Sequence, residues 1–381
     1  MSMRSDPAVP RVLIADDQPD VLEALRLLLA PQGFKVTPVT TPSAVVDQVR
    51  AAEWDAVLMD LNYQRGTTSG DEGLELLTQI RAARPDLPVI VMTAWGDIDL
   101  AVRAMRDGAQ SFVEKPWDNR KLVQILEREI AAGKGARERS ERHGREQRDA
   151  LLIQRALMPA SLPSTPRFEV AGAWQPAGTL GGDCYDVFLF GPDAIGVSIA
   201  DVAGKGLPAA LLMSSMQAAV RAFAHAASSP QALCASVNRL LCGQMIAGRF
   251  VTMAYTRLDA SRGTLAYANA GHNPPLLARS TGEVEQLSAS GTVLGVFADA
   301  EYQGAELALR SGDRLLLYTD GISEVRDGAE EEFGEERLKA SLVRNRHLGA
   351  ADLHAAMMNE VTRFATSGFQ DDATLLVIAI A

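Results

Sequence analysis

Val12-Leu13-Ile14-Ala15-Asp16-Asp17 joins a short apolar run to two adjacent carboxylates, and similar runs recur along the first third of the chain. The others are residues 34–39, 56–59 before Asp60, 89–92 before Thr93, and 111–114 before Lys115; only 34–39 carries no such polar group. Apolar runs separated by helical patterns are typical of a parallel sheet with helical crossovers. Because parallel strands end at the same edge, we expect these polar groups to converge in one crevice.

Helical patterns fill the intervals between the runs. They cover residues 20–29, 73–83, 98–106 and 119–130, and the first three stop close to a proline or glycine. The alternation of strand and helix predicts an α/β domain over residues 10–131. Its expected fold is flavodoxin-like, a five-stranded parallel doubly wound sheet.

Length and composition limit the class of protein. A chain of 381 residues favours two domains, and 47% hydrophobic residues suffice for two buried cores. No run is long enough for a membrane helix and no signal segment opens the chain, so we expect no membrane association. Three cysteines without metal-ligand spacing favour a cytoplasmic location. The net charge of −11 argues against a nucleic-acid partner.

At Asp16, Asp17, Asp60, Thr93 and Lys115-Pro116 the sequence resembles the response-regulator receiver domain. The resemblance implies that Asp60 accepts a phosphoryl group from a sensor histidine kinase or a small phosphodonor. Alone, the adjacent aspartates could instead cap a helix, but the five positions together favour the receiver. The segment after Asp60 is longer than in most receivers, as in those of enhancer-binding transcription regulators. No GxxxxGK[ST] phosphate loop or DNA-binding helix pair follows, which argues against a transcription factor.

The resemblance also implies roles for the residues around Asp60. Asp16, Asp17, Asp60 and the carbonyl of Asn62 would hold Mg²⁺, a hard cation that prefers oxygen ligands. Thr93 and Lys115 would contact the phosphoryl oxygens, and Phe112 would be the switch aromatic. The Lys115-Pro116 bond is a candidate cis peptide, since only X-Pro bonds adopt that form at low cost.

Residues 132–164 are interpreted as a helical linker. The stretch 131–150 mixes charges of both signs and has few apolar side chains, whereas apolar spacing returns over 151–158. A continuous helix and coiled coil from about 118 to 158 is one interpretation. Against it, Gly133, Gly135 and Gly144 each cost about 1 kcal/mol in a helix interior. A solvated linker therefore remains the alternative.

Residues 165–381 show a different pattern. Strands are expected at 168–174, 187–190, 195–200, 251–258, 264–268, 314–318 and 374–380, and helices at 207–226, 231–245, 335–346 and 350–365. Runs of strands with grouped helices predict a layered α+β domain, in which antiparallel sheets are flanked by helices.

Acidic residues mark the ends of these strands: Asp183 after Gly181-Gly182, Asp201, Asp320 and the pair Asp371-Asp372. Two carboxylates 4 Å apart repel by about 4 kcal/mol at an effective dielectric constant near 20, so a cluster of four calls for cations. No His or Cys has ligand spacing, and oxygen donors suit Mn²⁺ or Mg²⁺. Two such ions would activate a water against a phosphorus atom.

This region resembles the SpoIIE-like serine/threonine phosphatases of the metal-dependent 2C type. The matching strings are IQRALMPASLP, PAGTLGGDCYD, IADVAGKGLPAALLM, YANAGHNPPLL, LLYTDGISE and DDATLLV. The resemblance implies that two Mn²⁺ or Mg²⁺ are bound by Asp183, Asp201, the Val202 carbonyl, Asp320 and Asp371, with Asp201 bridging. Asp186 and Asp372 also match, and helping or capping roles are expected for them. Cys184 and Ala203 depart from the family pattern without removing a ligand.

Three other features each allow two interpretations. His272 could touch substrate, but a turn histidine before two prolines is more often structural. Gly204-Lys205-Gly206 could cradle a phosphate at a helix N-terminus, or its glycines could simply let the backbone approach the metals. The LGGD string is similar to the diguanylate cyclase signature, but Cys184-Tyr185 does not fit and the later strings would stay unexplained.

Together these features predict a response regulator whose output is a protein phosphatase. The family resemblance implies a phosphorylated anti-sigma-factor antagonist as substrate, in a partner-switching pathway. A homodimer through the receiver or the linker is expected. The alternative is a pseudophosphatase that binds and sequesters a signalling partner, and survival of all four aspartates favours catalysis.

Overall fold

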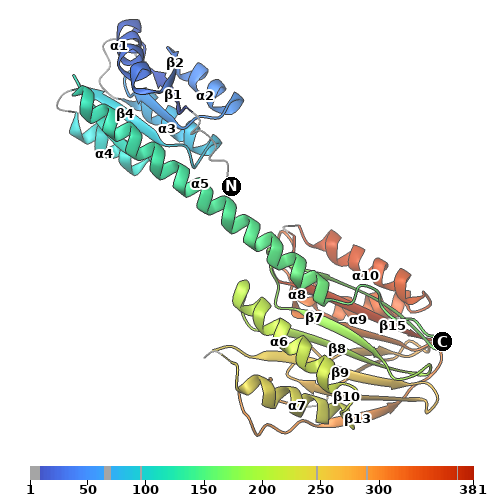
Figure 1. The fold of residues 1–381 in the computed structure, drawn as a ribbon. Coiled ribbons are helices and arrows are strands. Elements are labelled where there is room, and N and C mark those ends of the chain that lie inside the picture. Colours follow the sequence, from blue (N-terminus) through green and yellow to red (C-terminus); the bar gives the residue numbers. More distant parts are fainter. Residues whose placement is uncertain (1–8, 64–69, 95–96, 246–247, 289–290, 367) are drawn as a thin grey trace. The chain divides into compact units, whose positions relative to one another are not determined.

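The computed structural model describes residues 9–63, 70–94, 97–245, 248–288, 291–366 and 368–381 (Figure 1). The chain divides into two compact units, Met1–Arg145 and Glu146–Ala381. Residues 64–69, half of the longer segment that follows Asp60, lie outside the described residues. None of the helices that the structure describes is long and apolar enough to cross a membrane.

The first unit is built on a parallel sheet with strand order β2-β1-β3-β4-β5. Its strands are β1 (Arg11–Ala15), β2 (Lys35–Val39), β3 (Ala56–Asp60), β4 (Val89–Ala94) and β5 (Ser111–Lys115). Its helices are α1 (Pro19–Leu29), α2 (Pro42–Ala51), α3 (Asp71–Ala83), α4 (Ile98–Arg106) and α5 (Asn119–Leu157), with a 3₁₀ turn, η1 (Ala30–Gln32). This order confirms the flavodoxin-like fold; α2 had no predicted counterpart.

Side chains alternate between the two faces of this sheet and form two cores. Leu13 of β1 packs with the apolar residues of α2, α3 and α4. Val12 and Ile14 point to the other face and pack with α1 and the first part of α5. The period of two along each buried strand therefore determines which helices cover which face.

Helix α5 is continuous from Asn119 to Leu157, which confirms the single-helix interpretation of the connector. Gly133 packs directly against Pro88. A Cβ atom at this position would lie 2.6 Å from a Pro88 ring carbon, so only glycine fits there without a shift. Beyond Gly133 the helix still bonds to the first unit. Lys134 pairs with Asp55 at 3.4 Å, and Arg137 donates to the Trp54 carbonyl at 3.1 Å. The glycine thus allows close packing that offsets its low helix propensity.

The second unit contains two antiparallel sheets, ordered β13-β10-β9-β8-β7 and β12-β11-β14-β15-β6. The strands of the first are β7 (Cys184–Leu189), β8 (Ala194–Val202), β9 (Val251–Asp259), β10 (Thr264–Ala270) and β13 (Gly304–Ala308). Those of the second are β6 (Phe168–Gln175), β11 (Leu276–Ala278), β12 (Val284–Gln286), β14 (Arg314–Tyr318) and β15 (Ala373–Ile380). The short strands β11, β12 and β13 were not predicted.

Helices cover the outer faces of this pair of sheets, as Figure 1 shows. They are α6 (Leu207–Phe223), α7 (Pro230–Cys242), α8 (Asp320–Ser323), α9 (Gly334–Asn345) and α10 (Ala350–Phe364). Leu376 and Ile378 of β15 join the core shared with the other sheet, α6 and α7. Leu375 and Val377 face the opposite way, toward α9 and α10. The predicted layered α+β architecture is confirmed.

Candidate functional site

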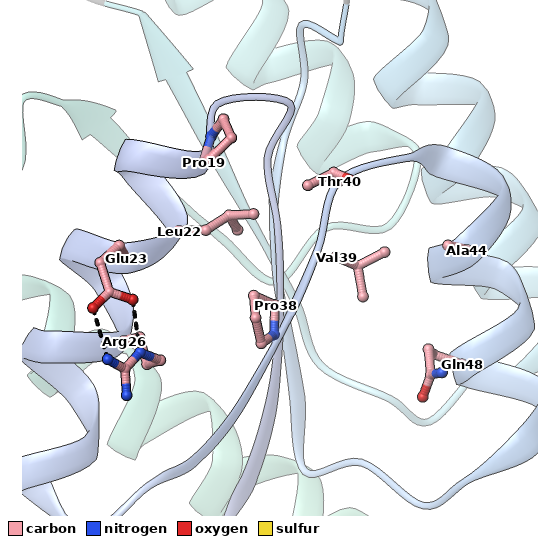
Figure 2. Close-up of a pocket in the computed structure, with 9 residues that line it drawn as sticks. All are labelled: Pro19, Leu22, Glu23, Arg26, Pro38, Val39, Thr40, Ala44 and Gln48. Atoms are coloured by element: carbon pink, nitrogen blue, oxygen red, sulfur yellow. Dashed lines mark hydrogen bonds and ion pairs between the residues drawn. The ribbon is translucent and has the colours of Figure 1, made fainter.

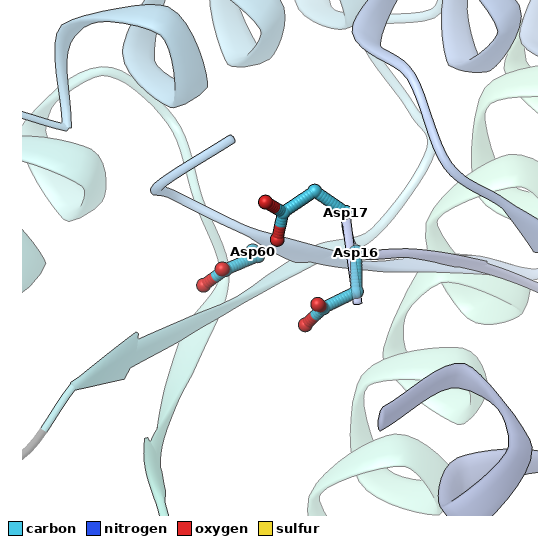
Figure 3. A group of neighbouring side chains, drawn as sticks. All are labelled: Asp16, Asp17 and Asp60. Atoms are coloured by element: carbon cyan, nitrogen blue, oxygen red, sulfur yellow. The ribbon is translucent and has the colours of Figure 1, made fainter. Parts of the chain in front are cut away.

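The first unit brings three carboxylates together at the predicted edge of its sheet. Asp16 and Asp17 follow β1 and Asp60 ends β3, and Figure 3 shows their side chains gathered at one place. One oxygen from each lies within 4.8 Å of the others. Asp16 and Asp60 are buried. This is the convergence expected from neighbouring parallel strands.

Lys115, at the end of β5, reaches into this group. Its Nζ lies 2.6 Å from Asp16 and 3.1 Å from Asp60. Burial raises the pKa of Asp60, and the Lys115 ammonium opposes that rise. Thr93 is buried in β4, whereas Phe112 in β5 is exposed. The Lys115-Pro116 bond is cis, as predicted.

The donors present in this pocket fit a hard cation. Oδ1 of Asp17 and Oδ1 of Asn62 are buried and have no hydrogen-bond partner among the described residues. Buried oxygens without a donor are costly unless a ligand or ion satisfies them. Carboxylate and amide oxygens are the ligands that Mg²⁺ takes in proteins.

In the second unit, two sheets deliver the predicted aspartates. Asp183 directly precedes β7, and Asp201 is the penultimate residue of β8 in the same sheet. Asp320 is the first residue of the short helix α8, not the last residue of a strand as expected, and Asp371 lies just before β15. Negative charge on Asp320 and Asp371 raises the pKa of Asp201, after burial itself. The four carboxylates therefore interact as a cluster across both sheets.

Asp183 is the most buried member of the cluster, with 1% of its surface exposed. Its Oδ2 accepts hydrogen bonds from the hydroxyls of Thr319 and Thr374, both at 2.7 Å. Its Oδ1 has no partner in the part of the chain that the structure describes. Burial, and then the charge of Asp201, raise the pKa of Asp183 well above its usual range. One oxygen is thus fixed and the other is available to a ligand.

Burial also comes first among the causes that raise the pKa of Asp201, to about 7, and of Asp320. A raised carboxylate pKa means that ionisation is opposed at neutral pH. Two bound divalent cations would reverse this, since they favour the ionised form. Among the described residues, the cluster contains no trio as compact as that of the first unit, whose ligand oxygens lie within 4.8 Å. All donors are oxygens, which fits Mn²⁺ or Mg²⁺.

The glycines beside Asp183 bring backbone segments close together. A Cβ on Gly182 would lie 2.9 Å from the carbonyl oxygen of Val202. The same carbonyl is the predicted backbone ligand. Only a residue without a side chain permits this approach, so Gly182 keeps the Asp183 turn against the end of β8.

The carboxylates of Asp372 and Asp186 bond to backbone nitrogens and to an arginine. Asp372 accepts from the backbone nitrogens of Ala177 at 2.9 Å and Gly182 at 2.5 Å. Asp186 is ion-paired with Arg221 of α6 at 2.5 Å. Both carboxylates are therefore bonded within the protein, whereas Oδ1 of Asp183 has no hydrogen-bond partner in the described ranges.

Lys205 lies at the exposed edge of the cluster. Its Nζ is 2.9 Å from Asp371 and donates to the Gln370 carbonyl at 2.8 Å. It lines a hollow of about 130 Å³, together with Asp371 and Arg326. The ammonium group therefore stands next to a predicted metal ligand, at the mouth of the site.

His272 is buried and bonded within the fold. Its Nδ1 lies 2.8 Å from the Thr252 hydroxyl, and Asn269 bonds both its backbone nitrogen and its carbonyl. Burial lowers its pKa to about 4. These contacts fit the structural role of a turn histidine.

Sequence reasoning assigned no role to three groups that the structure places beside the cluster. Thr319 and Thr374 support Asp183, and Gln154 of α5 bonds the backbone of Gly181. All three belong to strings that carry the phosphatase resemblance. The signal available in the sequence is a polar residue within an apolar stretch. Such a residue indicates a buried hydrogen bond but does not identify its partner.

A separate hollow of about 500 Å³ lies between α1 and α2 in the first unit (Figure 2). Its two charged lining residues, Glu23 and Arg26, pair with each other at 2.6 Å. None of the predicted site residues lines it.

Comparison with known proteins finds a family match for each of the two units. The response regulator receiver domain family matches residues 12–127, and the family described as stage II sporulation protein E (SpoIIE) matches residues 191–381, half of the chain. Asp201, Asp320 and Asp371 lie within the second match, and Asp183 lies just before it.

Individual relatives share parts of the chain. The phosphoserine phosphatase RsbU of Bacillus subtilis is 28% identical over 231 residues, covering 60% of this chain and 68% of RsbU. Protein IcfG of Synechocystis is 29% identical over 220 residues, 51% of this chain but only 35% of IcfG. The SiaA-PP2C domain of Pseudomonas aeruginosa superposes with a TM-score of 0.57 at 23% identity. It covers 64% of this chain and 98% of that domain, and this likeness shows the fold.

The parallel sheet with its acidic pocket, the paired antiparallel sheets with their aspartate cluster and the two family matches agree with one another. The chain belongs to the SpoIIE family of 2C-type protein phosphatases and carries a response-regulator receiver domain at its N-terminal side.

Proposed function

We propose that this chain is a response regulator whose output is a metal-dependent serine/threonine protein phosphatase controlled by phosphorylation of Asp60. The observation that carries the proposal is the buried Oδ1 of Asp183, which has no hydrogen-bond partner among the described residues and lies in a cluster of interacting carboxylates. The likeness to RsbU, which is named a phosphoserine phosphatase, supports the same activity.

The catalytic residues in this proposal bind two Mn²⁺ or Mg²⁺ ions; they are Asp183, Asp201, the Val202 carbonyl, Asp320 and Asp371. When bound, such a pair of ions supplies an activated water and neutralises charge on the phosphoryl group. The remaining residues orient these ligands. Thr319 and Thr374 hold one oxygen of Asp183, and Asp372 holds the backbone of the preceding Gly182.

The receiver supplies the control. Asp60 takes a phosphoryl group from a sensor histidine kinase or a small phosphodonor, with Mg²⁺ held by Asp16, Asp17, Asp60 and the Asn62 carbonyl. The added charge on Asp60 competes for Lys115, which now pairs with both Asp16 and Asp60. Thr93 and Phe112 respond to that change, and α5 carries it toward the second unit.

The proposed substrate is a phosphoserine or phosphothreonine on a phosphorylated anti-sigma-factor antagonist in a partner-switching pathway. The proposed assembly is a homodimer through the receiver or through α5, where a coiled coil could form. The resemblance to RsbU supports the substrate class.

Hydrolysis of p-nitrophenyl phosphate and of a phosphoserine peptide by the full chain, with added Mn²⁺ or Mg²⁺, tests the activity. Asp201→Asn should reduce turnover by more than the roughly 100-fold that loss of a ligand-supporting residue can cost. Asp299→Asn, an exposed aspartate outside the cluster, is the matched control and should keep full activity. Absence of turnover by the unmodified chain with either metal, with retained partner binding, would establish the pseudophosphatase instead.

Beryllofluoride or acetyl phosphate tests the control by the receiver. Phosphatase activity of the full chain should change on addition of either reagent with Mg²⁺. The same reagents should have no effect on Asp60→Asn. An equal response of the unmodified chain and of Asp60→Asn would show that phosphorylation of Asp60 does not control the phosphatase.

A further inference from the structure

Arg249 lies beside the turn that follows the proposed metal ligands of β8. It stands two residues before β9, in which Thr252 pairs with Asp201 of β8. The Ala203 nitrogen donates to the Phe250 carbonyl at 2.9 Å, so the two segments stay paired past the ends of both strands. This register carries Arg249 to the turn that begins after Ala203.

The guanidinium group of Arg249 is held against that turn. Its Nη1 donates to the Ala203 carbonyl at 3.1 Å. A Cβ atom on Gly204 would lie 2.6 Å from Nη1 and 3.2 Å from Cζ, so the group occupies a place that glycine leaves open. Gly204 also has a φ of 101°, a left-handed conformation that favours glycine. The place of this cation is therefore built into the backbone of the turn.

The charge of Arg249 has no acidic partner within the described ranges. A guanidinium carries five N–H donors, and the bond to Ala203 is the one that these ranges supply. Lys205, the next cation along the turn, pairs instead with Asp371 at 2.9 Å and donates to the Gln370 carbonyl. The half-buried Arg249 is thus the cation of this pair that can take an anionic ligand.

The position of Arg249 suits a carboxylate of the substrate better than its phosphoryl group. Val202 and Ala203 are consecutive, so the guanidinium lies about one residue's length beyond the proposed backbone ligand. In the described part of the chain it pairs with none of the four clustered aspartates, and so it stands beside the metal site. A peptide whose phosphoryl group meets the metals would pass this arginine with a flanking side chain. The planar fork of arginine matches the two oxygens of a carboxylate.

We propose that Arg249 is a specificity-determining residue: it binds an acidic side chain close to the phosphoserine of the substrate. The phosphatase then selects phosphorylated segments that carry a carboxylate at that place. The two anionic groups of the substrate are divided between the metals and the arginine. This rests on the proposed phosphatase function.

Steady-state hydrolysis of phosphoserine peptides by the full chain with Mn²⁺ tests the proposal. Each peptide carries one aspartate at a different position beside the phosphoserine, and its matched peptide carries asparagine there. At one position KM should be roughly 10-fold lower for aspartate, the size expected for a hydrogen bond to a charged group. The values of kcat should be similar, because the contact is the same in the ground and transition states. Equal KM values at every position would overturn the proposal.

Variants assign the preference to Arg249. Arg249→Gln keeps a donor for the Ala203 carbonyl but removes the charge, and should bring the ratio of the two KM values close to one. Arg262→Gln removes the same charge from the exposed turn after β9 and should keep the full ratio. If Arg249→Gln lowers kcat/KM for p-nitrophenyl phosphate as much as for the aspartate peptide, the arginine holds the phosphoryl group and the proposal is wrong.

A lysine variant covers the case in which Arg249→Gln does not fold. Arg249→Lys keeps the charge but lacks the planar fork, and should reduce the ratio of KM values without abolishing it. An unchanged ratio in this variant, in the absence of a folded glutamine variant, would count against the bidentate contact and overturn the assignment.

Peptide binding separates this proposal from the proposed function. If the metal-loaded chain binds the phosphopeptides without hydrolysing them, the phosphatase function fails. Fluorescence anisotropy of labelled peptides then still compares aspartate with asparagine on the unmodified chain and on the Arg249 variants. Tighter binding of the aspartate peptide that is lost in the variants supports the role of Arg249, and equal binding refutes it. Failure to bind either peptide would refute both proposals.

Discussion

The two acidic sites balance their charges in different ways. In the receiver, Lys115 lies within 3.1 Å of both Asp16 and Asp60, so a cation of the chain itself stands between two buried carboxylates. In the phosphatase, the ion pair found for the four aspartates in the described residues joins Lys205 to Asp371, at the exposed edge. Burial comes first among the causes that raise the pKa of Asp183 and of Asp201, and the negative charge of neighbouring aspartates adds to it.

The difference reflects how each site is built. Parallel strands of one sheet bring Asp16, Asp60 and Lys115 to one edge, and a lysine from β5 completes the charge balance. Two antiparallel sheets deliver the phosphatase aspartates, and hydroxyls and glycines surround the buried Asp183, while Lys205 pairs with Asp371 at the exposed edge. We infer that the first site is built to respond to added charge, and the second to require added cations.

Removing the lysine from each site should give the largest difference in stability between the two units. Lys115→Met leaves two buried carboxylates without their cation and should lower the stability of the metal-free receiver by about 3 kcal/mol. Lys205→Met, at a side chain that is 64% exposed, should cost less than about 1 kcal/mol. Hydrogen exchange followed separately in β1 and β8, with EDTA present, measures both. Equal losses would remove the distinction between the two sites.

The hydroxyls that hold Asp183 provide a smaller effect. Thr374→Val keeps the shape of the side chain but removes one donor to Oδ2, and should weaken Mn²⁺ binding about 10-fold, or about 1.4 kcal/mol. Thr374→Ser restores a hydroxyl and should bind nearly as well as the unmodified chain. Calorimetric titration with Mn²⁺ compares the two. If the serine variant binds as weakly as the valine variant, the hydroxyl is not the group that matters.

The smallest expected effect is a change in pH dependence. The folded pKa of Asp201 is raised to about 7, so the folded state holds a proton that the unfolded state has released. The contribution of Asp201 to stability is therefore present at low pH and is lost as pH rises from about 4 to about 7. Without metal, Asp201→Asn should be more stable than the unmodified chain near pH 7, because the asparagine has no charge for burial and the neighbouring carboxylates to oppose.

Urea unfolding of both proteins in EDTA, between pH 4.5 and 7.5, provides the measurement. The gain of the asparagine variant should shrink as pH falls. Asp16→Asn in the receiver is a useful companion, because it removes a partner of Lys115 and should give no such gain. A pH-independent difference for Asp201→Asn would mean that its carboxylate is not opposed by its neighbours.

Much of the receiver could be predicted from the sequence because its site is local. Each polar residue lies near the end of its own strand or directly after it, so a strand prediction also places the side chain. The five strands, the parallel order and the cis bond at Lys115-Pro116 all agree with expectation. The continuous helix α5 could not be decided, because the cost of Gly133 was visible in the sequence and its contact with Pro88 was not.

The phosphatase unit was harder to predict at the level of contacts. Strands β11 and β12 are three residues long, too short for a periodic signal. Asp320 follows a strand in sequence, yet it opens the helix α8 because the chain turns immediately after β14. The partners of Asp183 lie more than a hundred positions away along the chain, at Thr319 and Thr374.

The sequence by itself determined which elements form and which acidic residues stand at their ends, because hydrophobic periodicity and turn residues act over a few neighbours. Only the tertiary structure decided which oxygens are already satisfied and which remain free. That distinction separates Asp372, bonded by two backbone nitrogens, from Asp183, with one buried oxygen unpartnered among the described residues. It depends on hydrogen bonds between segments far apart in the chain, which no local pattern encodes.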